Sequence, residues 1–555
     1  MAEETSLEQG SKHGFSRRDF LKVAGAGLAT VAAVGSGVIA NERIIFSNEH
    51  KIDMDNYLSK IKVEGRDEWT INFTALRAFF PDVVKESEQG GFVLKNDSDK
   101  PVVLDFSNAG GKEIRLFPNY SSVAKSNMSW EKSQEPTGFG LVRGGLFLEG
   151  AFTVKGNIGR KPVFVGDVLD RVISFKGNGT ETCVVEDVEF KGLNAFKQDQ
   201  TGGGDCPSPA FIAGDDVNLE VRGIKIDYTP IKPGWADEVN SQLAKGIILH
   251  NTQNERPLKM LVTHSVIKGL EWDGVCANGL AEIQVVKSWL FQHRSYKQVR
   301  GVGIASTFNS PDGKISIVDS TVDYCKGTSI WVNEQTDLPR KISNLEIQDT
   351  TISNAGYAIS IDADQKTKIK NLNVSPDYAG GLQSDTEGFP LHLGWKGEKF
   401  DLSFENLNFN LSTDMGDGIK LMFFANWDEF ANFSNTSPKE FFDKHFGSWG
   451  DVSVKLKTDE GKIEEFKLSK QQFADFLVNF KSNETVNPSG MMLWFDTKIK
   501  QFVVLFATNL DPQGSMSFSE PYYFEDNINN VPNHGASLIP KTVSKRQSEF
   551  EPKVA

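Results

Sequence analysis

Two neighbouring stretches in the middle of the chain combine acids, bases and aromatic side chains at matching offsets. One stretch follows Ser265 and the other follows Ser288, and Glu271 and Arg294 each lie six residues after their serine. Lys326 repeats this offset after a third serine, so a carboxylate, a guanidinium and an amine stack if the three segments lie side by side. The candidate catalytic residues are Lys297, Arg300, Arg294, Glu271 and Asp273, and the candidate binding residues are Trp272 and His293.

The basic residues suit proton abstraction from an acidic sugar. A lysine or arginine with a lowered pKa can take the proton next to a uronate carboxylate while a second cation neutralises that carboxylate. We assign Lys297 as the base and Arg300 or Arg294 as the carboxylate clamp, because a guanidinium binds a carboxylate through two hydrogen bonds. Together these residues predict a polysaccharide lyase that works by β-elimination.

Two other interpretations stay open for the same residues. Hydrolysis of a glycosidic bond needs two carboxyl groups at a fixed separation, and the available pairs are Glu271 with Asp273 and Asp215 with Asp216. For the second pair we favour a turn that opens the strand at Val217. The charged residues can also form a solvated ion ladder, which contributes little energy and does no chemistry.

The elements that carry these residues repeat along the chain. From about Pro101 to Leu411, short apolar strands are separated by Asn, Asp, Gly and Ser, with almost no helical periodicity. One phrase recurs, in which a polar residue or glycine precedes an apolar, any, apolar triplet. This phrase begins at Asp187, Gly223, Asn344, Asn371 and Asn406, and a second phrase contains Ser288 and Ser320.

The spacing of the phrases predicts a solenoid. Ser265 and Ser288 are 23 residues apart, Ser288 and Ser320 are 32 apart, and Asn344 and Asn371 are 27 apart. Constant strands with variable spacing indicate a fixed coil that carries loops of unequal length. An antiparallel sandwich also contains many short strands, but it needs tight hairpin turns, and Asn-Gly or Asp-Gly turns are few here.

This coil pattern resembles the right-handed parallel β-helix repeat of pectate-lyase-like proteins, over about 300 of the 555 residues. The resemblance implies an all-β solenoid that handles polysaccharide, with its site on one outer strand face beneath long loops. The Gly-His-Gly and Arg-Ile-Lys motifs of the polygalacturonase type and the Arg-x-Pro-x-x-Arg stretch of pectate lyases are missing. A non-catalytic envelope or carbohydrate-binding β-helix protein therefore stays open as the alternative.

The first 40 residues have the pattern of an export signal, with a single transmembrane anchor as the alternative. Ser16-Arg17-Arg18-Asp19-Phe20-Leu21-Lys22 precedes an uncharged stretch from Val23 to Ala40 that is rich in Ala, Gly and Val. The paired Arg17 and Arg18 resemble the bacterial twin-arginine signal, which implies the twin-arginine machinery as a partner and a periplasmic or secreted location. We expect cleavage near Ala40 and no stable membrane span after processing.

Composition limits the remaining partners and cofactors. The chain has 60 Lys and Arg against 74 Asp and Glu, a net charge of −14, which disfavours nucleic acid. We expect no zinc or iron–sulfur site, because the Cys and His residues are not clustered, while Ca²⁺ with oxygen ligands stays open. The four cysteines, Cys183, Cys206, Cys276 and Cys325, form either disulfides or buried free thiols.

Five regions follow from these patterns. The signal occupies residues 1–40, an N-terminal cap region with one helix 41–100, the parallel β-helix 101–412, a small α+β domain or cap 413–540, and a flexible tail 541–555. Within the fourth region we expect one hairpin whose two strands flank Asp459-Glu460-Gly461. We expect a second hairpin formed by Met491–Phe495 and Phe502–Phe506. We also expect helices after Ser437 and Ser469, since Ser is a favoured N-cap residue.

Overall fold

The structure is a computed structural model in which Glu49–Ala555 forms one compact unit. It describes residues 50–63, 65–86, 92–116, 145–166, 171–191, 210–227, 245–253, 255–270, 273–291, 302–308, 313–323, 325, 328–334, 343–353, 357–362, 365–375, 391–393, 400–413, 418–425, 450–473, 490–510, 516–518, 522–523 and 542–543. The predicted signal with Arg17 and Arg18, the helix after Ser437 and the tail after 543 lie outside the described residues.

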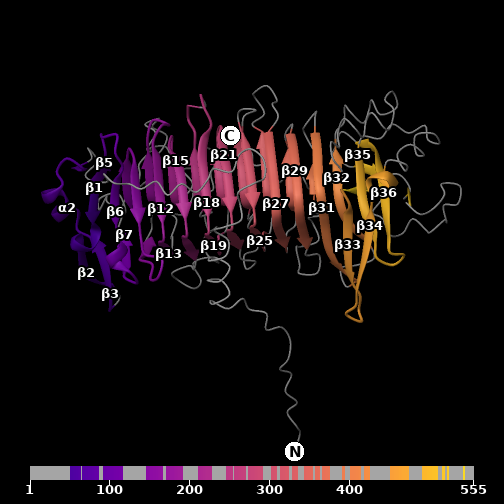
Figure 1. Cartoon of the computed structure of the whole chain (residues 1–555), viewed down its shortest axis with the longest axis horizontal. Coiled ribbons are helices and arrows are strands. Elements are labelled where there is room, and N and C mark those ends of the chain that lie inside the picture. The colour runs from indigo at the N-terminus through magenta and orange to yellow at the C-terminus, as the bar shows by residue number, and fades with distance from the viewer. Residues whose placement is uncertain are drawn as a thin grey trace, which may run out of the picture. The chain divides into compact units, whose positions relative to one another are not determined.

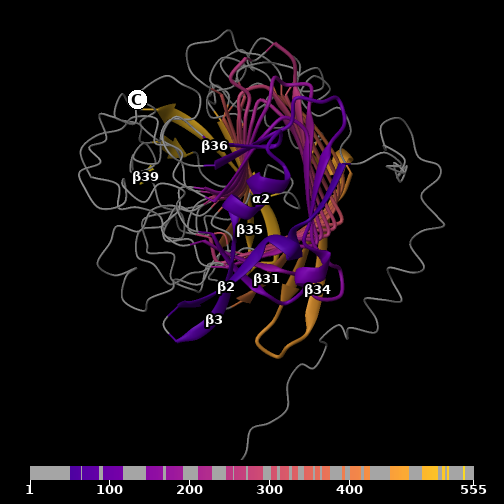
Figure 2. The same ribbon diagram turned by 90° about the vertical axis from the view of Figure 1, so that its left-hand side faces the viewer.

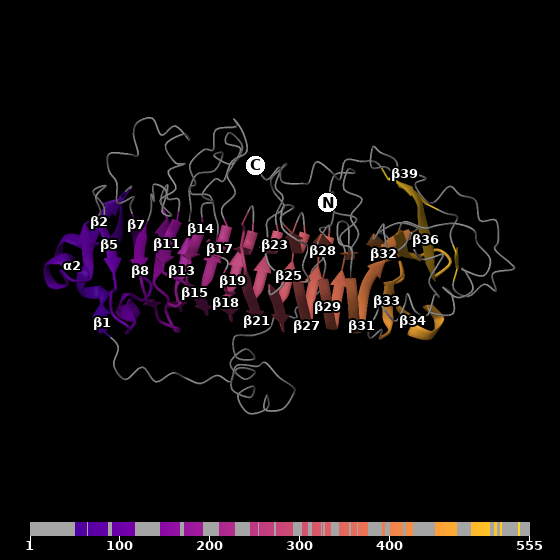
Figure 3. The ribbon, with the colours of Figure 1, turned by 90° about the horizontal axis from the view of Figure 1, so that it is seen from above.

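The chain winds as a solenoid in which each coil contributes strands to three faces (Figures 1 and 3). Every face is built from parallel pairs between equivalent strands of successive coils, which confirms the predicted all-β solenoid. The first face contains β1 (His50–Asp53), β6 (Val102–Asp105), β9 (Phe152–Lys155), β12 (Thr182–Glu186), β15 (Asn218–Arg222), β18 (Leu258–Thr263), β21 (Ala281–Val286), β24 (Lys314–Val318) and the first parts of β27 (Ser343–Ser353), β29 (Gln365–Ser375) and β31 (Phe400–Ser412).

The other two faces follow the same rule. The second face contains β3 (Arg66–Ile71), β7 (Glu113–Leu116), β10 (Val163–Gly166), β13 (Glu189–Lys191), β16 (Lys225–Asp227), β19 (Val266–Lys268), β22 (Trp289–Phe291), β25 (Thr321–Asp323), the second parts of β27, β29 and β31, and β33 (Val452–Lys457). The third face contains β5 (Phe92–Lys95), β8 (Leu146–Glu149), β11 (Arg171–Lys176), β14 (Ala210–Asp215), β17 (Lys245–His250), β20 (Asp273–Asn278), β23 (Val302–Phe308), β26 (Thr328–Glu334), β28 (Tyr357–Asp362), β30 (Leu391–Leu393) and β32 (Gly418–Ala425).

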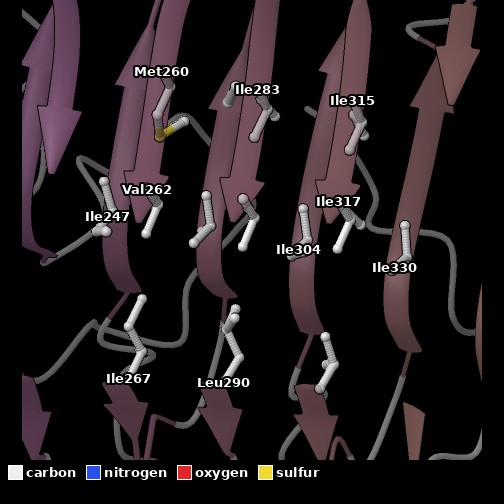
Figure 4. Close-up of a cluster of buried hydrophobic side chains, with 14 of the residues drawn as sticks. Ile247, Met260, Val262, Ile267, Ile283, Leu290, Ile304, Ile315, Ile317 and Ile330 are labelled. Carbon is white, nitrogen blue, oxygen red and sulfur yellow. The ribbon is translucent and has the colours of Figure 1, made fainter. Parts of the chain in front are cut away.

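Apolar side chains from the three faces fill the interior as ladders. Figure 4 shows one such region, where residues of equal position on successive coils, such as Ile283 and Ile315, follow one another along the solenoid. Phe106, Phe164, Phe190 and Phe211 form another ladder, with ring centroids 5.1–5.9 Å apart. These four rings are fully buried, so part of the high Phe content of the sequence serves interior stacking.

A single residue of left-handed conformation turns the chain from the first face to the second. Its φ lies between 48° and 58° in eight coils, at Asp187, Gly223, His264, Lys287, Asp319, Asp349, Asn371 and Asn406. The backbone N–H of this residue bonds to a carbonyl of the next coil, as in Asp187 to Arg222 at 3.0 Å. The polar residue or glycine that begins the sequence phrase at Asp187, Gly223, Asn371 and Asn406 is therefore a turn residue, because Asn, Asp and Gly tolerate positive φ.

Ladders of small polar side chains continue behind these turns. The backbone N–H of Ser265 donates to Ser288 Oγ at 3.3 Å, and that of Ser288 donates to Ser320 Oγ at 3.2 Å, which confirms their predicted alignment. The predicted alignment of Asn344 with Asn371 is wrong. Asn371 instead donates to Asp349 at 2.6 Å, and Asn344 lies within the first face, in register with Lys366. The error arose because β27 is one continuous strand that passes through the turn.

Hairpins and short helices lie at the two ends of the solenoid (Figures 1 and 2). Towards the N-terminus, η2 (Met54–Tyr57), β2 (Leu58–Val63), α2 (Phe73–Phe79), β4 (Val84–Glu86) and η3 (Ser107–Ala109) accompany the first coils, with β2 antiparallel to β3 and β4 antiparallel to β5. The parallel pairing already begins at β1, well before residue 101.

Both hairpins predicted for the C-terminal region are confirmed. β33 pairs with β34 (Ile463–Leu468), and β35 (Gly490–Asp496) pairs with β36 (Gln501–Leu510). β35 also adds an antiparallel strand to β32 of the third face. β37 (Met516–Phe518), β38 (Tyr522–Tyr523) and β39 (Thr542–Val543) continue from β36. Ser469 forms a capping box with Gln472, as expected for a helix start.

Cys183, Cys276 and Cys325 are buried free thiols. Burial raises the pKa of each to about 12, so all three are protonated at neutral pH. Cys206 lies outside the described residues. For the three described cysteines, the structure therefore shows buried free thiols, one of the two options that the sequence left open.

We expect Asp187→Asn to stabilise the protein at neutral pH. Burial at the turn raises the pKa of Asp187 above its ordinary value, although Lys161 opposes this. A carboxyl group whose pKa is raised on folding makes its full contribution to stability at pH values below its ordinary pKa. This contribution is lost as the pH rises through the raised pKa. Asparagine keeps the tolerance for positive φ without the charge, so the variant should unfold at a higher temperature at pH 7 and at the same temperature near pH 3.

Asp349→Asn at the equivalent turn is the control of opposite sign. Hydrogen bonds from Asn371 and Gln348 lower the pKa of Asp349, so its contribution is present above the ordinary value and is lost as the pH falls through the lowered one. This variant should unfold at a lower temperature than the parent at pH 7. Thermal unfolding curves that shift in the same direction for both variants would show that the turn charge does not act as described.

Candidate active site on the third face

Only one of the candidate site residues predicted from the sequence is described. Asp273 is the first residue of β20 on the third face. Glu271, Trp272, His293, Arg294, Lys297 and Arg300 lie outside the described residues, as does Lys326. Lys268, Phe291 and Asp323 each lie three residues before one member of the predicted stack, and they are in register on adjacent coils. The offset inferred from the serines therefore holds up to these three residues.

Charged side chains lie on the outward side of the third face yet are withdrawn from water. In β17, Ile247 and Leu249 join the interior core, whereas Ile248 belongs to a separate outer cluster with Ala210, Ala213 and Cys276. Trp331 packs against the same cluster. Buried charged residues of this side are Arg171, Asp215, Lys245 and Asp273, with 3–8% of their surface exposed, and Lys420 in β32, with 9% exposed. Such burial of outward charges is unusual unless they are paired or serve a site.

The first charged group joins two neighbouring coils at the start of their strands. Lys245 Nζ lies 3.0 Å from Asp273 Oδ2 and 3.8 Å from Cys276 Sγ. Burial alone lowers the pKa of Lys245, but Cys276 and the Asp273 carboxylate together outweigh it and raise the pKa above its ordinary value. Lys245 is therefore a permanent cation and not a proton acceptor, and Asp273 serves as its counter-ion.

The second charged group joins Arg171, the first residue of β11, to Asp215, the last residue of β14. Arg171 Nη1 donates to Asp215 Oδ2 at 2.6 Å, and Asp215 is in register with His250 on the next coil. Burial lowers the pKa of His250 to about 4, so its imidazole is neutral at pH 7. Within the described residues, His250 Nε2 and Ser174 Oγ are buried without a hydrogen-bond partner. Two such atoms on one outward side indicate a place for a polar ligand.

Sequence reasoning missed Arg171, Lys245 and His250. The sequence does contain a signal for Arg171 and Lys245. The strands of the third face share a three-residue pattern, in which the first residue is followed by a small residue or valine and then by a branched apolar residue. Arg171, Lys245 and Asp273 all occupy its first position. That pattern was hidden because Ala210 holds the equivalent position in the coil between Arg171 and Lys245.

Other residues considered for the site lie in turns. Asp216 has a φ of 52° between β14 and β15, and its carboxylate accepts hydrogen bonds from the backbone N–H and the hydroxyl of Thr252, as the favoured turn interpretation predicts. Asp215 belongs instead to the end of β14. His264 occupies the turn between the first and second faces, so it does not flank the third face.

The described residues contain no group of three or more His, Cys, Asp or Glu side chains that could hold a metal ion. Among the helices that the structure describes, none combines the length and apolar character needed to cross a membrane.

Comparison with known proteins yields little similarity. No protein-family profile and no curated protein matches the chain. Among solved structures, the gp42 tailspike of Acinetobacter phage vb_AbaP_AS12 aligns over 89% of this chain and 96% of its own, with 8% sequence identity and a TM-score of 0.26. A TM-score this low supports neither a shared fold nor a shared function, so the fold rests on the strand pairing described above.

We expect the Lys245–Asp273 pair to behave as a buried ion pair. Asp273→Asn leaves a buried cation without its counter-ion and should lower the free energy of unfolding by about 3–5 kcal/mol. The double variant Lys245→Met/Asp273→Leu removes both charges and should recover most of that loss. Chemical denaturation of the three proteins measures the effect.

The matched control is the exposed pair Lys314–Glu346, whose atoms are 2.8 Å apart with side chains about 40% exposed. Glu346→Gln should cost less than about 1 kcal/mol, because water screens an exposed pair. An Asp273→Asn variant as stable as Glu346→Gln would rule out the buried-pair interpretation.

Proposed function

We propose that this protein binds and processes a polysaccharide along the outward side of its third face. The observation that carries the proposal is the row of buried polar and charged groups there, which lies on successive coils rather than at one point. Equivalent positions on neighbouring coils are about 4.8 Å apart, so the row can contact an extended polymer at several places. Ser174 Oγ and His250 Nε2 supply unpartnered polar atoms for such a ligand.

The described part of the third face is suited to binding rather than to proton abstraction. Arg171 and Lys245 are each paired with a carboxylate, and the raised pKa of Lys245 excludes it as a base. For a lyase reaction we propose Lys297 as the base, with Arg294 or Arg300 holding the uronate carboxylate, since these residues follow one another closely in the sequence.

Glycoside hydrolysis stays open as an alternative reaction. It needs two carboxyl groups about 5–9.5 Å apart, and Glu271 with Asp273 is the pair available for it. Asp273 is already engaged with Lys245 at 3.0 Å. We prefer β-elimination because of the basic residues between Arg294 and Arg300, and non-catalytic binding is the further alternative.

We expect Lys297→Ala to lower the rate of β-elimination by about 10²–10⁴-fold, the usual contribution of a general base. Wild-type protein and variant are incubated with pectin, alginate and a glycosaminoglycan, and the unsaturated product is followed by its ultraviolet absorbance. The exposed Lys314→Ala serves as the control and should keep full activity.

The product distinguishes the competing functions. New reducing ends without an unsaturated bond would replace the lyase proposal with a hydrolase, and binding without any product would leave the binding protein. Absence of binding and of product on the whole panel would reject the polysaccharide proposal.

We further propose that the chain is exported through the twin-arginine route to the periplasm or beyond. Support comes from the Arg17-Arg18 pair and the weakly apolar stretch that follows. The Arg17→Lys/Arg18→Lys variant should accumulate unprocessed in the cytoplasm of a bacterial host, whereas Arg43→Lys should be exported normally. Cell fractionation followed by immunoblotting measures both, and normal export of the first variant would refute the proposal.

A further inference from the structure

The second face carries an aromatic pair on its outward side. Trp289 and Phe291 project outwards from β22, while Leu290 between them is buried in the core. The two rings meet edge to face with centroids 5.8 Å apart, and 44% of the Trp289 surface is exposed. Among the described residues Trp289 is the one tryptophan with such exposure, so its indole ring is available to a ligand.

A strip of small polar side chains continues from this pair along the next coils. Trp289 is in register with Thr321 and Phe291 with Asp323, and the same two outward positions recur on three further coils. The strip consists of Thr321, Asp323, Thr351, Ser353, Asn373, Ser375, Asn408 and Asn410, all partly exposed. Hydrogen bonds between coils orient it, from Ser353 to Asp323 at 2.6 Å and from Asn408 to Asn373 at 3.2 Å.

The polar strip differs from the second face on either side of it. Towards the N-terminus the same outward positions hold ion pairs, with Lys225 bonded to Glu189 and Lys268 close to Asp227. Beyond the strip, Lys455 is in register with Asn410. Asp323 is the one charged side chain of the eight, so the aromatic pair marks a change from a charged to a nearly uncharged surface.

This combination suits the hydroxyl groups and ring faces of an uncharged sugar chain. Asn, Ser and Thr each offer hydrogen-bond donors and acceptors, and an aromatic face covers the apolar C–H face of a sugar ring. From Trp289 to Asn408 the surface extends over four coil steps, about 19 Å, which is long enough for several contacts. A polyanion is disfavoured here because the strip lacks cations and the chain carries a net charge of −14.

We propose that Trp289, Phe291 and this polar strip form a second glycan-binding surface, which takes an uncharged stretch of polysaccharide. The inference extends the proposed function by naming a separate contact with the ligand, and it does not depend on catalysis at the third face.

The experiment is affinity electrophoresis of the full chain in gels that contain hydroxyethylcellulose, galactomannan or polygalacturonate. Trp289→Ala and Asn373→Lys should weaken binding to one of the uncharged polymers at least tenfold. The control Ile463→Ala removes an apolar side chain that is 67% exposed, more than Trp289, from the β33–β34 hairpin and should bind as the parent does. Thermal unfolding verifies that each variant is folded.

The outcomes separate this inference from the proposed function. Binding that both variants retain would overturn the second surface while the polysaccharide proposal stands. Trp289-dependent binding without any product from uronate polymers would support the surface and leave the lyase reaction refuted. Failure of the parent to bind either uncharged polymer would overturn the inference.

Discussion

Backbone hydrogen bonding between equivalent strands of successive coils is the constraint on which the rest of the structure depends. It makes residues that are 22 to 54 positions apart direct neighbours, as for Ile347 with Ile369 and Leu94 with Leu148. Every ladder then follows, because a residue type repeated at one position of the coil becomes a continuous row in space. The aromatic interior, the serine ladder and the outward charges are three results of the same stacking.

The left-handed turn between the first and second faces keeps this stacking in register. A residue with positive φ is required in each coil there, and its N–H bonds to the next coil. Where asparagine fills the turn, its side chain adds a second bond along the stack, as from Asn406 to Asn371 at 2.7 Å. His264 and Lys287 occupy the same position, so the backbone requirement outweighs the usual preference for Asn, Asp or Gly.

The outward sides of the third and second faces differ in how far their polar groups are hydrated. On the third face, charges such as Lys245 and Asp273 are removed from water and must neutralise each other. On the second face, Thr, Ser and Asn side chains stay partly hydrated and keep donors and acceptors on the surface. Because each surface extends along the solenoid axis, both have the shape needed to contact an extended polymer.

Much of this fold was encoded in local sequence pattern, including the solenoid, the alignment of Ser265 with Ser288 and both C-terminal hairpins. These features depend on short-range periodicity and on turn residues, which the sequence displays directly. The pairing of Lys245 with Asp273 and of Arg171 with Asp215 was decided only by the tertiary structure. Unequal loop lengths hide which coil positions meet, and burial of an outward side chain depends on what covers it, which no local pattern records.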